Sequence, residues 1–296
     1  MADGPAVVFR SHNRHACADR ALVLMSLAIA HEVVEDADGY AIVVAEADAE
    51  RARFELWQYA QENPPPTPPA PPAVTVAEHN ALPGVAGYAL VLCIAAWLSG
   101  VGAFGVDWFG AGRIDGALVR EGQWWRTLTA LTLHGSLGHL LGNLGFGTLF
   151  GLLAGRVVGP GVAWLTIVLA SAAANAMNTV LLVSSHRSIG ASTAVFAALG
   201  LVAGFVWRGR LMAQDRWPYR LGPVVGGIAL LAFTGTGDEN TDIGAHLAGF
   251  VCGFAAGIVL TRVARGFGSR RLQWLCGSTA LLLIVAAWAA ALSYRL

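Results

Sequence analysis

The chain has 296 residues, of which 55% are hydrophobic and 13% are charged, and its formal net charge at pH 7 is zero. A soluble protein carries about 25% charged residues, so this composition is typical of a membrane protein with several spans. The balanced charge gives no indication of a nucleic-acid partner. The four cysteines include no C-x-x-C pair, which favours buried thiols, and we expect neither a metal nor a cofactor.

Residues 1–62 are predicted to form a small, soluble, cytosolic α/β domain with the order α-β-β-α. The turn sequence Asp36-Ala-Asp-Gly39 indicates a hairpin between the two strands. The first residues are mixed and polar rather than a signal peptide, so the N-terminus is expected in the cytosol. The predicted elements are a helix at 17–30, strands at 32–35 and 40–45, and a charged amphipathic helix at 47–62.

Residues 63–83 are predicted to be a linker. The run from Pro64 to Pro72 is dominated by proline, which favours a stiff, extended polyproline II conformation. The small domain is therefore expected to be separate from everything that follows.

Seven apolar segments follow, each close to the length of about 20 residues that crosses a bilayer. If the N-terminus is inside, more arginines fall in the inner loops than in the outer ones, which agrees with the positive-inside rule and leaves the C-terminus outside. The segments are 84–105, 134–155, 161–183, 191–208, 221–236, 242–263 and 273–293.

Polar residues in these segments are functional candidates, because polar groups are costly in a bilayer, and His134, His139, Ser192 and His246 all lie within two turns of the outer ends. Ser192 begins the fourth segment, where free N–H groups and the positive end of the helix dipole favour an oxyanion. His246 lies about one turn into the sixth segment, and a neutral histidine can accept the serine proton. His139 and Asn143 share one helix face and can both donate hydrogen bonds to an oxyanion.

Small residues form a stripe on both the fourth and the sixth segment, and such stripes let membrane helices approach closely. The sequence therefore predicts tight packing of these two helices, with Ser192 facing His246. The stripes contain Phe196, Gly200 and Gly204 after the serine, and Gly249, Gly253 and Gly257 after the histidine. Asp242, four residues before His246, is expected to cap the sixth segment.

Three motifs in this order resemble those of the rhomboid family of intramembrane serine proteases, over about residues 84–263. The first is a W-R pair followed by H-x4-H-x3-N, the second is G-x-S-x, and the third is A-H-x-x-G-x-x-x-G. Their residues here are Trp125, Arg126, His134, His139 and Asn143, then Gly190 and Ser192, then Ala245, His246, Gly249 and Gly253.

The resemblance implies a six-helix core in which Ser192 is the nucleophile, His246 is the general base and no aspartate takes part. His139, Asn143 and the Ser192 backbone would form the oxyanion hole. Residues 264–296 would add a seventh transmembrane helix, and the fifth segment would gate substrate entry. The supporting positions would be Gly190, Phe196, His134, Trp125, Arg126, Gly249 and Gly253.

The resemblance also implies the partners and the location. Substrates would be transmembrane proteins cut in or near their membrane segments, within the lipid bilayer and without a cofactor. The composition, rich in Ala and with arginine as its only long basic residue, favours the inner membrane of a bacterium. Two residues depart from the family pattern. Thr193 replaces the common glycine after the nucleophile, and Phe196 replaces a common tyrosine beneath the histidine.

Three other functions predict sequence features of their own. An inactive relative that binds membrane clients would show loss of the serine or the histidine, and both Ser192 and His246 are present. A transporter would show inverted repeats and charges at mid-membrane, which the sequence lacks. A membrane metalloprotease would carry H-E-x-x-H, and no such motif occurs.

Overall fold

The computed structural model describes residues 4–36, 38–64, 79–181, 186–209, 222, 225–227, 229 and 242–294. The chain divides into an N-terminal unit, 1–71, and a C-terminal unit, 72–296. Most of the predicted linker lies outside the described residues.

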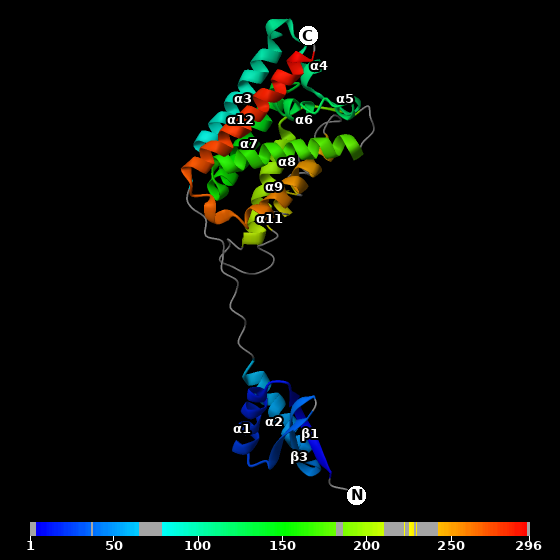
Figure 1. Ribbon diagram of the computed structural model, residues 1–296, viewed down its shortest axis with the longest axis vertical. Helices are drawn as coiled ribbons and strands as arrows, with labels where there is room; N and C mark the ends of the chain where they lie inside the picture. The colour runs from blue at the N-terminus through cyan, green and yellow to red at the C-terminus, as the bar shows by residue number, and fades with distance from the viewer. Residues whose placement is uncertain are drawn as a thin grey trace. The chain divides into compact units, whose positions relative to one another are not determined.

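The N-terminal unit is a three-stranded antiparallel sheet with two helices (Figure 1). The predicted hairpin pairs β2 (His31–Asp36) with β3 (Gly39–Ala45), with Asp36 opposite Gly39. Helices α1 (Arg14–Ser26) and α2 (Ala49–Glu62) pack on the sheet through a core that includes Cys17, Leu24 and Ile42. The Cys17 thiol is fully buried, and burial raises its pKa.

One strand of this sheet was not predicted. β1 (Pro5–Ser11) pairs with β3 and takes the place opposite β2, so the order of elements is β-α-β-β-α rather than α-β-β-α. Its apolar residues Ala6, Val7, Val8 and Phe9 form a continuous run, without the alternation that marks a half-buried strand. Pairing with β3 across the intervening helix decides its conformation.

The C-terminal unit contains six described helices that are long and apolar enough to cross a membrane. They are α3 (Leu82–Gly100), α7 (Leu137–Val158), α8 (Pro160–Leu181), α9 (Ser192–Gly209), α11 (Ile243–Leu260) and α12 (Arg270–Ser293). These helices match the predicted segments other than the fifth. The fifth segment, 221–236, lies mostly outside the described residues.

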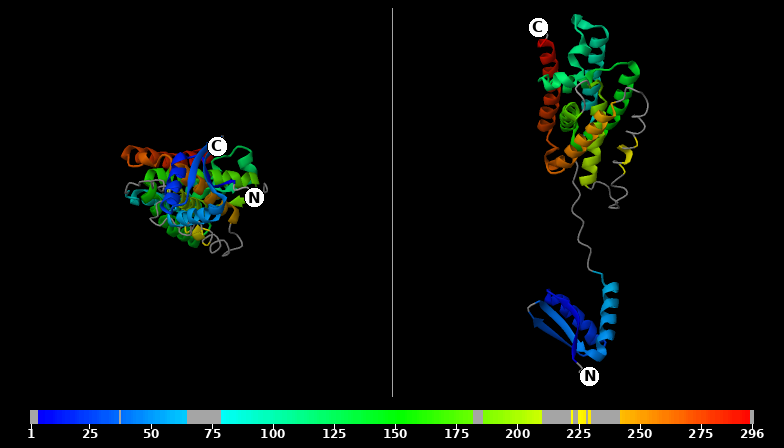
Figure 2. Two further views of the ribbon diagram at one scale, coloured as in Figure 1. Left: turned by 90° about the horizontal axis from the view of Figure 1, so that it is seen from below. Right: turned by 90° about the vertical axis from the view of Figure 1, so that its right-hand side faces the viewer.

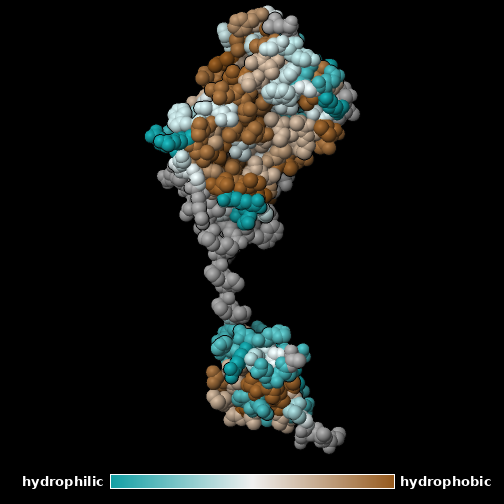
Figure 3. Space-filling view, in the orientation of Figure 1, coloured by the Kyte–Doolittle hydropathy of each residue, from teal (hydrophilic) through white to brown (hydrophobic). Residues whose placement is uncertain are grey.

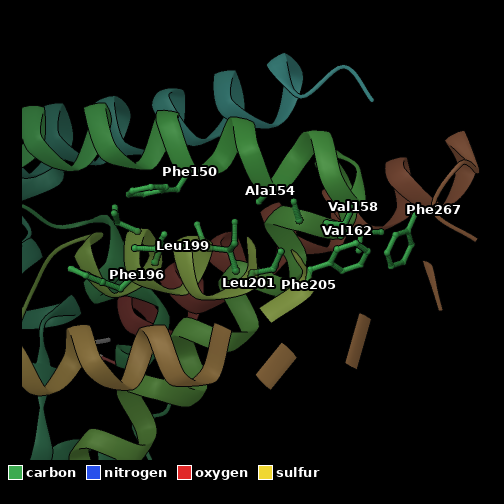
Figure 4. Packing of buried hydrophobic residues seen from close by; sticks show 14 of the residues in the cluster. Phe150, Ala154, Val158, Val162, Phe196, Leu199, Leu201, Phe205 and Phe267 are labelled. Carbon is green, nitrogen blue, oxygen red and sulfur yellow. The ribbon is translucent and has the colours of Figure 1, made fainter. Parts of the chain in front are cut away.

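Helix α9 is the central helix of this unit. In its most apolar window 72% of the residues are buried, against 17% for α12, which lies at the edge (Figure 2). The main core joins α9 to α7 and α8 through residues such as Phe150, Val162 and Leu201 (Figure 4). The outer surface carries many exposed apolar residues, as a lipid-facing surface does (Figure 3).

The predicted packing of the fourth and sixth segments is confirmed. A Cβ atom built on Gly253 would lie 2.1 Å from the Ala197 carbonyl oxygen, and one on Gly200 would lie 2.2 Å from the Phe250 carbonyl oxygen. No side chain fits at such distances. Glycine on both helices therefore lets the backbones of α9 and α11 touch.

A compact loop structure connects α3 to α7. It contains the short helices α4 (Trp108–Gly112), α5 (Gly116–Arg120) and α6 (Arg126–Thr129), a 3-10 helix at Ala130–Thr132, and the strand β4 (Ile114–Asp115). β4 pairs with β5 (Arg187–Ser188), and Arg187 Nε lies 3.2 Å from Asp115 Oδ2. This pairing joins the loop to the segment that leads into α9.

Candidate active site

Ser192 is the first residue of α9 and is partly exposed. Two backbone N–H groups hold the segment before it. The Gly190 N–H donates to Ala130 O at 2.9 Å, and the Ala191 N–H donates to the side chain of His134 at Nε2, at 3.4 Å. Gly190 has φ +124°, a conformation that favours glycine. The position of Ser192 is therefore set by the loop before it as well as by its helix.

His246 lies one turn inside α11 and is buried. Its ring stacks on Phe196 with 4.6 Å between the ring centroids and 23° between the planes. Phe196 is one turn along α9 from Ser192, so helix geometry brings the histidine ring close to the serine. Within the described residues no hydrogen bond joins Ser192 Oγ to His246. Such bonds often tighten only when substrate binds.

The next turn of α11 sets the approach of the two helices. A Cβ on Gly249 would lie 2.5 Å from the Thr193 carbonyl oxygen. Gly249 and Gly253 therefore contact the α9 backbone directly, as their place in the predicted stripe requires. Thr193, which departs from the family pattern, is buried with its side chain beside Gly249.

His139 and Asn143 lie on the other side of the serine segment. A Cβ on Gly190 would lie 2.6 Å from His139 Nε2 and 3.8 Å from Asn143 Nδ2, so both side chains border the residue two before the serine. Asn143 Nδ2 donates to His139 O at 3.1 Å. Ser136 caps α7 by accepting from the His139 N–H at 3.1 Å, which fixes where this helix begins.

His134 lies in the loop before α7 and holds the serine segment. Its Nδ1 lies 3.3 Å from Thr132 O, and its Nε2 accepts from the Ala191 N–H. These partners assign the proton to Nδ1. Burial, with a further contribution from His139, lowers the pKa of His134 to about 4, so the ring is neutral near pH 7.

Trp125 and Arg126 are buried in the loop structure rather than beside Ser192. The Arg126 guanidinium donates to Gln123 Oε1 at 2.7 Å, Arg113 O at 2.8 Å and Gly110 O at 3.0 Å. These bonds tie α6 to α4. The pair therefore supports the site through the fold of the loop.

Asp242 caps α11, as predicted: its Oδ1 accepts from the Ala245 N–H at 2.9 Å. The same carboxylate also contacts two residues that no motif in the sequence singles out. Asn178 Nδ2 of α8 donates to Oδ1 at 3.4 Å, and His186 Nε2 lies 2.9 Å from Oδ2. No sequence pattern indicates these contacts, because the three residues are distant in the chain.

Comparison with known proteins agrees with this architecture. Residues 121–263 match the model of the rhomboid domain. The chain is 30% identical over 163 residues to "Rhomboid protease GluP" of Bacillus subtilis (strain 168), which covers 55% of this chain and 31% of that protein. It is 29% identical over 149 residues to "Rhomboid-like protease 1" of Toxoplasma gondii, which covers 49% of this chain and 50% of that protein.

A third relative, "Rhomboid-like protease 2" of Toxoplasma gondii, is 30% identical over 146 residues. The chain spans half or less of the length of these relatives, since 31%, 50% and 50% of the three proteins are covered. The matched domain covers all of α7, α8, α9 and α11, together with the later part of the loop structure before α7. The chain therefore contains a rhomboid domain over residues 121–263 and, with six apolar helices among its described residues, is an integral membrane protein.

Proposed function

We propose that the chain is an intramembrane serine endopeptidase that hydrolyses peptide bonds in or near the transmembrane segments of other proteins. The observation that carries this proposal is the stacking of His246 on Phe196, one helical turn from Ser192. The relatives are named as proteases, which supports the same reaction.

Ser192 and His246 would act as a dyad. His246 accepts the proton of Ser192 Oγ while the oxygen attacks the substrate carbonyl carbon. The resulting tetrahedral intermediate collapses when the amine leaves and takes the proton from His246. Water then hydrolyses the acyl-enzyme by the same two steps, and Ser192 is regenerated.

The tetrahedral intermediate needs hydrogen-bond donors where its oxyanion forms. The Ser192 N–H lies in the first turn of α9, where backbone N–H groups have no partner within the helix. His139 and Asn143 border the same segment and supply side-chain donors. One such donor is worth roughly 3 kcal/mol of barrier in serine hydrolases.

The remaining predicted site residues would serve as supports. Gly190 makes room for His139, and Gly249 and Gly253 let α11 approach α9. His134 holds the Ala191 N–H, and Trp125 and Arg126 stabilise the loop.

The proposed substrates are transmembrane proteins, and the proposed location is the inner membrane of a bacterium. The N-terminal unit would lie in the cytosol and the C-terminus outside. Protease protection of tags placed at the two ends of the chain in sealed inner-membrane vesicles tests this orientation. A C-terminal tag accessible only from the periplasmic side is the expected result.

A second candidate is a membrane protein that binds clients without cutting them. The buried His246 Nδ1 has no hydrogen-bond partner among the described residues, so the ring is held there by its stacking on Phe196 and not by a hydrogen bond to Nδ1. The family's more common tyrosine hydroxyl is also absent at Phe196. Both features point to a weaker base than a fully oriented histidine.

Cleavage of a transmembrane reporter by the purified protein in liposomes distinguishes these functions. Wild type is expected to cut, while Ser192→Ala and His246→Ala lose activity. Ser99→Ala, which removes a serine from α3, is the matched control and keeps activity.

A fluorophosphonate that labels Ser192 in wild type but not in His246→Ala shows the dyad without a reporter. Cleavage by Ser192→Ala would contradict the assignment, and binding of the reporter without cleavage or labelling would favour the second candidate.

A further inference from the structure

A groove of about 570 Å³ lies among α3, α8 and α12, and its lining extends to Ala191, the residue before Ser192. Its walls are mostly apolar and include Leu92, Ile167, Leu281 and Ile284. In Figure 1, α3 and α12 are drawn on the same side of the C-terminal unit. Both helices lie outside the segment that matches the rhomboid domain, whereas α8 lies inside it, so the groove lies where the flanking helices meet that domain.

Helix α12 is held apart from α3 by anchors at both of its ends. Near its start, Gln273 Oε1 accepts from the N–H groups of Gly161 and Val162 at 2.9 and 3.0 Å. Near its end, Trp288 Nε1 donates to Thr132 Oγ1 at 3.1 Å, and the Trp288 ring packs on Trp108. Because both ends are attached to other elements, the groove between them is a built feature of the fold.

Most of the polar residues of the groove lie where α3 and α12 begin. Asn80 and Arg270 line this end, and Arg270 is exposed. His79 Nε2 and Trp164 Nε1 also line the groove, and both atoms are buried without a hydrogen-bond partner among the described residues. An unsatisfied buried polar atom is costly, so a ligand with oxygen acceptors would stabilise these two atoms, and a negative charge on it would complement Arg270.

The length of the groove fits one lipid chain. From Arg270 to Ile284 the helical rise gives roughly 21 Å, whereas one leaflet contributes about 15 Å of hydrocarbon. The remaining length accommodates the glycerol and phosphate region. A glycerophospholipid supplies an acyl chain for the apolar wall, ester oxygens for Trp164 and a phosphate for Arg270.

We propose that this groove binds one anionic glycerophospholipid, with its headgroup at Arg270 and one acyl chain between α3 and α12. The lipid fills the space between the two helices that flank the rhomboid domain. This proposal does not rest on the proposed protease activity, because it is tested by lipid binding and not by cleavage.

Native mass spectrometry of the full chain in micelles with equal amounts of dioleoylphosphatidylglycerol and dioleoylphosphatidylcholine tests the site. Wild type is expected to retain one phosphatidylglycerol. Gly87 lines the groove, and a Cβ there meets no atom within 4 Å, so Gly87→Phe fills the groove and removes the bound lipid. Gly100→Phe is the control, since Gly100 is on the same helix, equally open and outside the groove.

A second pair of variants tests the headgroup contact. Arg270→Gln is expected to weaken retention of phosphatidylglycerol about fivefold, the effect of one arginine on an anionic lipid. Arg271→Gln is the control, because Arg271 is the exposed neighbour that does not line the groove. Equal lipid retention by wild type and Gly87→Phe would overturn the proposal. Equal headgroup preference in the two arginine variants would overturn the assignment of the phosphate to Arg270.

Discussion

His186 and Asp242 lie 2.9 Å apart and join the segment before α9 to the first turn of α11. The two residues precede Ser192 and His246 by six and four positions. The same carboxylate caps α11 and accepts from Asn178 of α8. A single side chain therefore connects the three elements that carry and surround the proposed dyad.

Asp242→Ala is expected to lower both stability and turnover. Loss of the cap costs about 1 kcal/mol, and loss of the contact to His186 releases the serine segment, so kcat falls more than KM changes. Ser269→Ala is the control, because it removes the cap of α12 without touching the dyad. Thermal unfolding and cleavage kinetics on both variants check this, and equal kcat in the two variants would contradict a positioning role.

A double-mutant cycle tests the pair itself. If His186 acts through Asp242, the effects of His186→Ala and Asp242→Ala on kcat are not additive, and the double variant resembles Asp242→Ala. Fully additive effects would show that His186 acts on something else.

Gly253→Ala is expected to disrupt the packing of α9 on α11. Its new Cβ would lie 2.1 Å from the Ala197 carbonyl oxygen, so the helices must separate, at a cost of about 1–3 kcal/mol. Gly145→Ala in α7 is the matched control, because no atom lies within 4 Å of its Cβ. Unfolding in detergent should show a loss of stability for Gly253→Ala and none for Gly145→Ala. An unchanged midpoint for Gly253→Ala would mean that the helices adjust without strain.

The stacking of Phe196 on His246 predicts that activity requires an aromatic side chain at position 196. Phe196→Tyr keeps the ring and should retain activity, whereas Phe196→Leu removes the stacking. An aromatic contact is worth about 1 kcal/mol beyond its buried area, so kcat should fall about fivefold in the leucine variant. Steady-state kinetics measure the difference, and equal activity of the two variants would show that stacking of a ring on His246 does not contribute to catalysis.

The buried His134 predicts a loss of stability in acid. Its pKa is lowered to about 4 in the folded protein, against about 6.5 in the unfolded chain, so between these values the unfolded state binds the extra proton. The contribution of the neutral His134 ring to the free energy of unfolding is therefore complete above about pH 6.5, and it is lost as the pH falls toward 4. Between pH 7 and pH 5 the free energy of unfolding is expected to fall by about 2 kcal/mol through this group.

His134→Gln supplies the comparison, because a glutamine can still accept from the Ala191 N–H but does not titrate. The difference in unfolding free energy between wild type and this variant should shrink as the pH is lowered from 7 to 5. Parallel pH profiles for the two proteins would show that His134 is not the titrating group.

Much of this protein is determined by local sequence. The six described spans follow from apolar runs of the right length, because a bilayer imposes length and hydrophobicity on each helix independently. The close packing of α9 on α11 was predictable from small residues repeating on one face of each helix. The cap of α11 by Asp242 was predictable because capping involves neighbours in the chain.

Tertiary structure decided what depends on distant partners. The strand β1 exists because β3 offers it an edge, and its own residues carry no alternating pattern. The contact between His186 and Asp242, the role of Arg126 in the loop, and the groove between α3 and α12 join residues far apart in sequence. Such contacts leave no periodic mark, since the free energy that fixes them arises only when separate elements are packed together.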